Sequence, residues 1–327
     1  MRVTTNVTKT VAFVGYRSSD GGFVPQGTAF FVMTHSRPDN SGFLHLVTAQ
    51  HVIRDIQAKS EIVALRINDK SGKYFMGWIP LEQWHYHPDA ARYVDVAVAP
   101  CQFPSEANAD WSCIGLPEQF ATDEVLTKYS IGPGDDVFLT GYFSYFPGER
   151  KNIPIVRMGN IAAMPDEPLT TRGGVPMNGY LIEARSIGGL SGSPVFVQMA
   201  PWRIVDGTVS QFTGMTHYLL GLVHGHYDVA ANSPAEQAKK DTEKAERINV
   251  GIGVVVPVKD IWETIMQPEL EEGRQKKLKE MDDSPSGIVP DSLPDAPSLS
   301  RDDILRTMLN TPPNPRVQGK KRAKRAR

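Results

Sequence analysis

The sequence contains few cysteines and no long apolar run. Only two cysteines, Cys101 and Cys113, occur among the 327 residues, which is too few for a disulfide framework. The N-terminal stretch MRVTTNVTKTVAFVGYR has no apolar run of the length that a signal peptide or a membrane span requires. We therefore expect a cytoplasmic protein with two buried thiols and no membrane partner.

Helical patterns are also scarce before about residue 265, and the net charge of −2 indicates no particular partner. Short apolar runs rich in Val, Ile, Phe and Tyr dominate this region, and Gly, Pro, Asp or Asn bound many of them, as is typical of β-strands. A parallel βαβ fold would need a helix between most strands. The sequence therefore predicts an all-β protein built from barrels or sandwiches. The twelve runs are VAFVGY, GTAFFVMT, FLHLVTA, EIVALRI, YFMGWIPL, VDVAVAP, DDVFLTGYF, IPIVRMGNI, GYLIEA, PVFVQ, YLLGLVHG and VGIGVVVPV.

The composition changes near residue 267, which predicts one globular domain and one extension. The domain covers residues 1–266 in two halves, about 8–113 and 114–266, and PVKDIWETIM predicts a short helix at its end. A capping-box pattern in SPAEQAKKDTEKAER predicts another helix inside the second half. Residues 267–327 comprise a charged helix, a proline-rich linker and a basic tail, most of which we expect to be disordered.

The basic tail holds seven Lys or Arg residues among the last twelve positions, which leaves a charge of about −9 on the rest of the chain. One interpretation is a solvated segment that binds nothing. The other is a tether that binds nucleic acid or an acidic partner weakly through its charge. The sequence leaves both interpretations open.

Three stretches of the sequence carry residues with catalytic potential. HLVTAQHVI contains His51, YVDVAVAP contains Asp95, and GGLSGSPVF contains Ser191. Each residue alone has an ordinary structural interpretation, as a polar residue at a strand end or in a turn. A phosphate-binding loop around Ser191 is disfavoured, because no lysine follows and the segment leads into an apolar strand instead of a helix.

The three residues together supply the parts of a nucleophilic site. A serine hydroxyl is a weak nucleophile unless a neighbouring base takes its proton. Histidine titrates near neutral pH and can accept that proton, and a carboxylate then fixes its tautomer. Glycines beside the serine allow backbone N–H groups to approach a developing oxyanion.

TAQH, DVAV and GLSGSP resemble the T-A-A-H, D-I-A-L and G-D-S-G-G-P boxes of chymotrypsin-fold, trypsin-like serine proteases, and the serine loop is most similar to the bacterial HtrA-like and glutamyl-endopeptidase branch. The resemblance covers residues 8–266. It implies two antiparallel β-barrels with the site between them, and a serine endopeptidase that forms an acyl-enzyme and needs no cofactor. Ser191 would be the nucleophile, His51 the general base and Asp95 the orienting carboxylate. The oxyanion hole would be the N–H groups of Gly189 and Ser191.

The sequence departs from the family pattern at Leu190, where many members have an acid. Leucine cannot pair with a cleaved N-terminus, so we expect the serine loop to be held by packing alone and to need no N-terminal processing. The family implies that substrate binds along GLVHGHYD, and no acid stands at the base of the expected pocket, which favours a small or apolar P1 residue. The candidate substrate-binding residues are Arg185, His224, Gly225 and His226.

The sequence indicates no metal site. His85 and His87, like His224 and His226, form His-x-His pairs whose members share one face of a strand. No cysteine or carboxylate completes a recognisable ligand spacing for zinc. An alternative to the enzyme is a non-catalytic protease-fold module that binds a peptide or scaffolds a complex.

Overall fold

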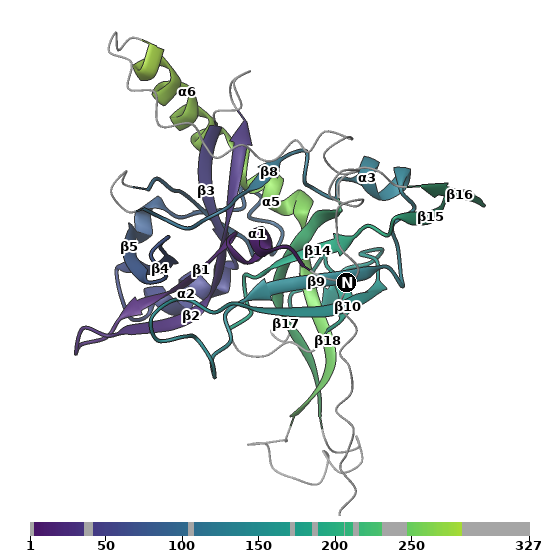
Figure 1. Ribbon diagram of the computed structural model, residues 1–327, viewed down its shortest axis with the longest axis horizontal. Helices are drawn as coiled ribbons and strands as arrows, with labels where there is room; N and C mark the ends of the chain where they lie inside the picture. The colour runs from purple at the N-terminus through teal and green to yellow at the C-terminus, as the bar shows by residue number, and fades with distance from the viewer. Residues whose placement is uncertain are drawn as a thin grey trace, which may run out of the picture. The chain divides into compact units, whose positions relative to one another are not determined.

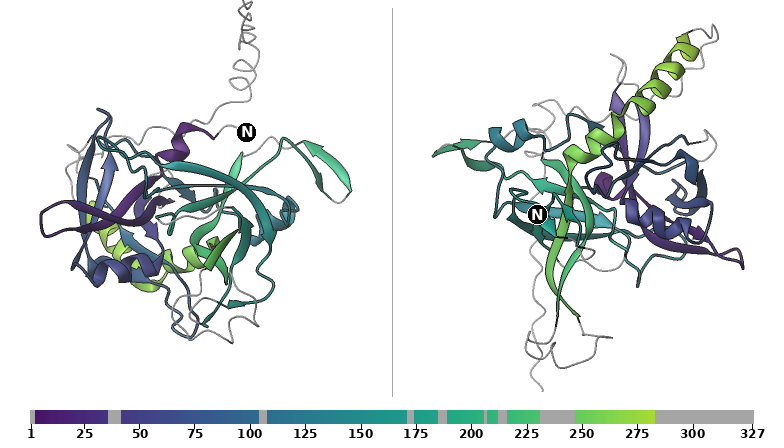
Figure 2. Two further views of the ribbon diagram at one scale, coloured as in Figure 1. Left: turned by 90° about the horizontal axis from the view of Figure 1, so that it is seen from below. Right: turned by 180° about the vertical axis from the view of Figure 1, so that it is seen from behind.

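The computed structural model divides the chain into two units, Met1–Met281 and Asp282–Arg327. The described residues are 3–35, 42–103, 108–170, 174–184, 189–205, 207–211, 216–230 and 247–282. The predicted proline-rich linker and basic tail lie outside the described residues, as does almost all of the helix predicted from SPAEQAKKDTEKAER. Figures 1 and 2 show the described elements from three sides.

Strands dominate the first unit, which confirms the predicted all-β class. The helices are α1 (Thr5–Thr8), α2 (Gln50–Gln57), α3 (Asp123–Lys128), α5 (Val258–Ile265) and α6 (Pro268–Asp282), with a 3₁₀ turn η1 (Leu81–Gln83). The strands are β1 (Val11–Arg17), β2 (Phe23–His35), β3 (Gly42–Thr48), β4 (Ile62–Asn68), β5 (Tyr74–Pro80), β6 (His85–Tyr86), β7 (Ala97–Pro100), β8 (Ile114–Leu116), β9 (Asp136–Gly141), β10 (Ile155–Ala163), β11 (Leu169–Thr170), β12 (Pro176–Met177), β13 (Tyr180–Glu183), β14 (Pro194–Gln198), β15 (Trp202–Val205), β16 (Thr208–Gln211), β17 (His217–Ala230) and β18 (Arg247–Pro257). Each of the twelve predicted runs contributes a strand.

The N-terminal half forms an eight-stranded sheet, drawn in purple and blue in Figure 1. Its strand order is β5-β4-β1-β2-β3-β7-β6, and β8 adds to β2 in parallel. Strand β8 comes from the stretch between the two halves, so this connection extends the sheet instead of only linking the halves. The pairing of β3 with β7 sets Thr48 opposite Ala97 and so brings the ends of two motif-bearing segments together.

The C-terminal half contains a closed six-stranded barrel in the order β10-β13-β18-β17-β14-β9. Alternation along β14 follows from the period of two in a strand. The buried apolar residues form two clusters, a smaller one inside this barrel and a larger one centred on the N-terminal half. Val195 and Val197 belong to the smaller cluster, whereas Phe196 belongs to the larger one. Phe196 stacks on Phe138 with ring centroids 5.1 Å apart. The two hydrophobic clusters therefore meet along the strand that follows the serine loop.

Two helices follow the barrel. Helix α5 confirms the predicted short C-terminal helix, and none of the described helices is long and apolar enough to cross a bilayer. Helix α6 is fastened by Arg274, a buried residue whose guanidinium donates to the carbonyl of Ile265 (2.9 Å) and to Nε2 of His45 on β3 (3.1 Å). Glu271 pairs with the same guanidinium at 2.8 Å. A buried cation thereby attaches this charged helix to the sheet.

Candidate active site

The His51 and Asp95 side chains meet because their strands pair. His51 lies three residues after Thr48, in the first turn of α2, and Asp95 lies two residues before Ala97 at the start of β7. Nδ1 of His51 is 2.7 Å from Oδ2 of Asp95, and the backbone N–H of His51 donates to Oδ1 at 2.8 Å. The structure thus brings together two of the three predicted residues and directs Nδ1 of the imidazole to the carboxylate.

The Asp95 carboxylate is fully buried and remains ionised. Burial raises the pKa of a carboxyl group, but the charge of His51 and hydrogen bonds from His51 and His224 outweigh burial and hold the pKa of Asp95 well below its usual range. Burial lowers the pKa of His51, but the charge and hydrogen bond of Asp95 raise it above the ordinary histidine value. This pairing favours a proton on the imidazole.

Ser191 lies in a loop whose two flanking glycines adopt left-handed backbone conformations. The φ angles are +96° at Gly189 and +79° at Gly192. A Cβ atom at Gly189 would collide with the ring of Tyr142, and one at Gly192 would collide with the carbonyl oxygen of Thr28 and the hydroxyl of Thr48. Only glycine fits these positions, which explains the lack of side chains around the serine.

The prediction that packing alone holds this loop is wrong. Leu190 is indeed fully buried in the barrel core. Backbone hydrogen bonds also fix the loop: the N–H of Gly192 donates to Val223 O at 2.8 Å, and the N–H of Ser193 donates to Leu190 O at 2.9 Å. Buried backbone groups must be paired, and a loop that leads into a barrel strand finds partners on the next strand.

Thr28 on β2 ties the serine loop to the N-terminal sheet. Its backbone N–H donates to the carbonyl of Ser191 at 3.0 Å, and its hydroxyl donates to the carbonyl of Gly189 at 3.0 Å. The same hydroxyl accepts the N–H of Tyr142 at 2.8 Å. Sequence reasoning assigned Thr28 no role and placed it only in the predicted strand run GTAFFVMT.

His224 occupies a place that the sequence did not predict. It was expected to line a substrate pocket, but its Nδ1 lies 2.5 Å from Oδ2 of Asp95, the oxygen that His51 also contacts. The rings of the two histidines meet edge to face, with centroids 5.4 Å apart. The hydroxyl of Ser191 donates to the backbone carbonyl of His224 at 3.3 Å. His224 therefore contacts both the carboxylate and the serine.

The other predicted substrate-binding residues are less informative. Gly225 and His226 lie on β17, where they pair with Val254 and Gly253 of β18 and are half-buried. Arg185 lies outside the described residues. Tyr93 was not predicted at all, yet its ring lies edge-on to His224 with centroids 6.2 Å apart. Its position two residues before Asp95 was the only signal in the sequence.

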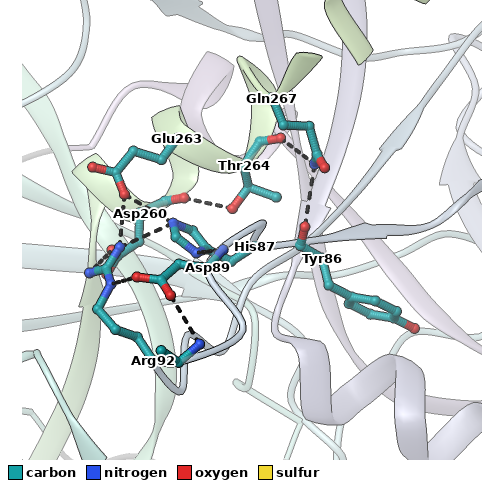
Figure 3. Close-up of polar contacts among 9 residues, drawn as sticks. Tyr86, His87, Asp89, Arg92, Asp260, Glu263, Thr264 and Gln267 are labelled. Atoms are coloured by element: carbon teal, nitrogen blue, oxygen red, sulfur yellow. Dashed lines mark hydrogen bonds and ion pairs between the residues drawn. The ribbon is translucent and has the colours of Figure 1, made fainter. Parts of the chain in front are cut away.

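A second polar cluster joins α5 to the segment that precedes β7 (Figure 3). The guanidinium of Arg92 lies 2.9 Å from Asp89, 3.3 Å from Asp260 and 2.9 Å from Glu263. Nε2 of His87 lies 2.9 Å from the same Glu263 carboxylate. This network fastens α5 to the backbone that leads to Asp95.

Two groups among the described residues have ligand atoms close enough to hold a metal ion. His51, Asp95 and His224 form one, and their ligand atoms lie within 4.8 Å of one another. His87 belongs to the other, with Asp260 and Glu263. In the second group, Arg92 already neutralises both carboxylates, which disfavours a further cation there. Neither group corresponds to the His-x-His pairs noted in the sequence.

Comparison with known proteins gives similarity only at the level of three-dimensional structure. No protein-family model matches the chain, and no curated sequence matches it. Two structures described as HtrA-type protease AlgW with a decapeptide are 15% identical, with TM-scores of 0.44 and 0.43, and the matches cover 82% of this chain. The matched regions make up 66% and 73% of the two AlgW chains. This chain therefore spans just under two thirds of the length of the first AlgW chain. Deg5 matches with a TM-score of 0.42 and 12% identity over 79% of this chain and 87% of its own.

Proposed function

We propose that the chain is a serine endopeptidase that cleaves peptide bonds through an acyl-enzyme intermediate. The observation that carries the proposal is the pairing of His51 with the buried carboxylate of Asp95 beside the glycine-flanked loop of Ser191. Burial of an ionised carboxylate costs free energy, which its hydrogen bonds to the imidazole offset. The contact at Nδ1 leaves Nε2 of the ring free to act as a base.

The proposed roles follow from the atoms. The hydroxyl of Ser191 attacks the peptide carbonyl while Nε2 of His51 takes its proton. His51 then returns this proton to the leaving amine, the amine departs, and water hydrolyses the acyl-enzyme by the same base. Asp95 keeps the proton of Nδ1 between itself and the ring and stabilises the imidazolium at each stage. No cofactor is required by this scheme.

The backbone of the serine loop is suited to stabilise the oxyanion. Among the described residues, the N–H groups of Gly189 and Ser191 have no hydrogen-bond acceptor, whereas the neighbouring Gly192 and Ser193 N–H groups are paired. Unpaired, fixed N–H groups are the donors that an oxyanion hole needs. We assign the hole to Gly189 and Ser191 on this basis and expect a small or apolar P1 residue.

One observation favours a second function, a non-catalytic module that binds a peptide or scaffolds a complex. The hydroxyl of Ser191 donates to the carbonyl of His224, and no hydrogen bond joins it to His51 in the described part of the chain. A serine held in this rotamer is not activated. Rotation about its Cα–Cβ bond would be needed to place Oγ against the imidazole.

Hydrolysis of a peptide library tests the proposal against this alternative. The endopeptidase predicts turnover by the wild-type protein that falls by about 10⁶-fold in Ser191→Ala, because a catalytic triad acts as a unit. Wild-type protein that binds peptides without cleaving any of them would support the binding module instead. The cleavage profile would also test the expected preference for small or apolar P1 residues.

A further inference from the structure

A second histidine, His224, contacts the carboxylate of Asp95. Asp95 accepts three hydrogen bonds: from the backbone N–H of His51 at Oδ1, and from Nδ1 of His51 and of His224 at Oδ2. Three N–H donors on one fully buried carboxylate leave it little freedom to turn. Sequence reasoning accounts for the first histidine only.

We propose that His224 is a positioning residue, whose imidazole holds the Asp95 carboxylate in the orientation that His51 requires and whose carbonyl holds the resting hydroxyl of Ser191. The inference rests on the proposed endopeptidase function and deepens it. It gives β17, the strand that carries His224, a part in the proposed triad.

The contacts make the imidazole N–H the feature that matters. Asp95 is ionised and acceptor-only, so each histidine must present Nδ1–H to it. The ring of His224 meets the rings of Tyr93 and His51 at their edges, and Asp95 is the one acidic side chain that it contacts among the described residues. Asp55 contributes a further negative charge near His51. The hydrogen bond to Asp95 is therefore a specific contact within an otherwise aromatic setting.

A hydrogen bond to a buried charge is expensive to remove. When His224 is truncated, Oδ2 of Asp95 keeps one donor, and the carboxylate can rotate away from the plane in which His51 holds it. If the free energy of a hydrogen bond to a charged group is lost from the transition state, the reaction rate of Ser191 should fall by about 10- to 100-fold. A neutral donor at the same place should recover that rate.

The test compares His224→Ala with His224→Asn. The amide nitrogen of asparagine lies two bonds beyond Cβ, as Nδ1 of histidine does, so this variant restores the donor without an ionisable ring. The readout is the rate at which a fluorophosphonate probe labels the protein at pH 8. The matched control is His217→Asn, a half-buried histidine on the same strand that contacts Phe138 and Phe196 instead of the triad.

We expect the alanine variant to be labelled about 10- to 100-fold more slowly than wild type, and the asparagine and control variants to be labelled within a few-fold of wild type. A proton NMR spectrum supplies a second readout. Two strongly deshielded N–H signals are expected in wild type, and one in each variant at position 224, since each histidine donates one short hydrogen bond to Asp95.

The positioning role would be overturned if wild type and the alanine variant were labelled at the same rate. It would also be overturned if the alanine and asparagine variants lost the same rate and wild type showed only one deshielded signal. Failure of the proposed function looks different, because wild-type protein would then not be labelled at all. In that case the NMR signals still report on the two histidines. Two deshielded signals would support the shared contact, and one would contradict it.

Discussion

At the scale of single residues, the site depends on the hydrogen bonds that the buried carboxylate of Asp95 accepts. Asp95 combines complete burial with three N–H donors, and the imidazole of His51 gains basicity from it. The same contact sets the pH at which the site can work, because only neutral His51 can accept the proton of Ser191.

The acid limb of the pH profile should reflect the raised pKa of His51. Because Asp95 raises this pKa, kcat/KM should fall to half at a pH above about 6.5, the ordinary histidine value. In Asp95→Asn the attraction is lost while burial still disfavours the charged ring, so the midpoint should move to lower pH and the rate should drop by about 10⁴-fold. A midpoint that stays in place after this substitution would contradict the assignment, and His217→Asn provides the control profile.

The contact between His51 and Asp95 could be expected from sequence, but the second histidine partner of the carboxylate could not. His51, Asp95 and Ser191 stand in local motifs, so the letters around each one are informative. His224, which contacts Asp95, lies where the register of β17 against β18 shifts between Val223 and Gly225. A bulge of this kind changes which face a side chain occupies, and local sequence does not report it.

At the scale of elements, the serine loop is shaped by glycines that lie against other segments. Gly192 approaches β2 and the end of β3 so closely that no side chain fits. The left-handed conformation at this position adds a second reason for glycine. Sequence suggested the oxyanion function of these glycines, but only the packing shows that two of them are also sterically required.

Gly192→Ala should shift the loop and displace Ser191. A displacement of about 1 Å can cost on the order of 10²-fold in rate, so fluorophosphonate labelling should slow by that factor in protein that remains folded. Gly72→Ala is the matched control, because it also has a positive φ of +80° but no neighbouring atom near the added Cβ. Equal labelling of the two variants would contradict the steric account.

The helix α2 was missed from sequence, and α6 was expected without its contacts. QHVIRDIQ follows an apolar strand directly, and its buried residues Val52, Ile53 and Ile56 continue the apolar pattern of that strand. Helix α6 is charged on nearly all sides, so its sequence gave no sign that Arg274 would be buried against His45. The spacing of apolar residues along a sequence does not indicate which distant polar side chains pair.

The contact between α6 and β3 predicts a pH-dependent stability. Burial and the nearby charge of Arg274 lower the pKa of His45 to about 4 in the folded protein, while the unfolded chain titrates near 6.5. The unfolded state therefore binds more protons between these values, so stability is complete above about pH 6.5 and declines as pH falls towards 4.

Thermal unfolding of His45→Gln isolates this contribution. Oε1 of glutamine can accept from Arg274 at the place of Nε2 but does not titrate. We expect the unfolding temperature of wild type to fall more steeply than that of His45→Gln between pH 6.5 and 4. Identical slopes for the two proteins would show that His45 does not titrate with folding.

At the scale of the whole molecule, the chain combines an acidic main part with a basic tail. The last twelve residues carry seven positive charges, and the remainder carries about −9. If the tail is a tether, its binding to nucleic acid is electrostatic and weakens steeply with salt. The residues proposed for catalysis all lie before residue 282, so we expect the tail not to affect peptide cleavage.

A variant that ends at Asp282 tests this division, because it keeps α6 and removes the predicted linker and tail. We expect the full chain to bind DNA or RNA weakly at low salt, the shortened chain not to bind, and both to cleave a peptide equally well. Filter binding at two salt concentrations beside a peptide assay measures both properties. Equal nucleic-acid binding by the two proteins would contradict the tether.

The most direct test of the account is to locate the residue that reacts with a fluorophosphonate. The labelled protein would be digested and the modified peptide identified by mass spectrometry. The account predicts one adduct, on Ser191, which is absent in Ser191→Ala and forms very slowly in His51→Ala. A folded wild-type protein that acquires no adduct, or an adduct on another serine that persists in Ser191→Ala, would contradict the claim that this site is catalytic.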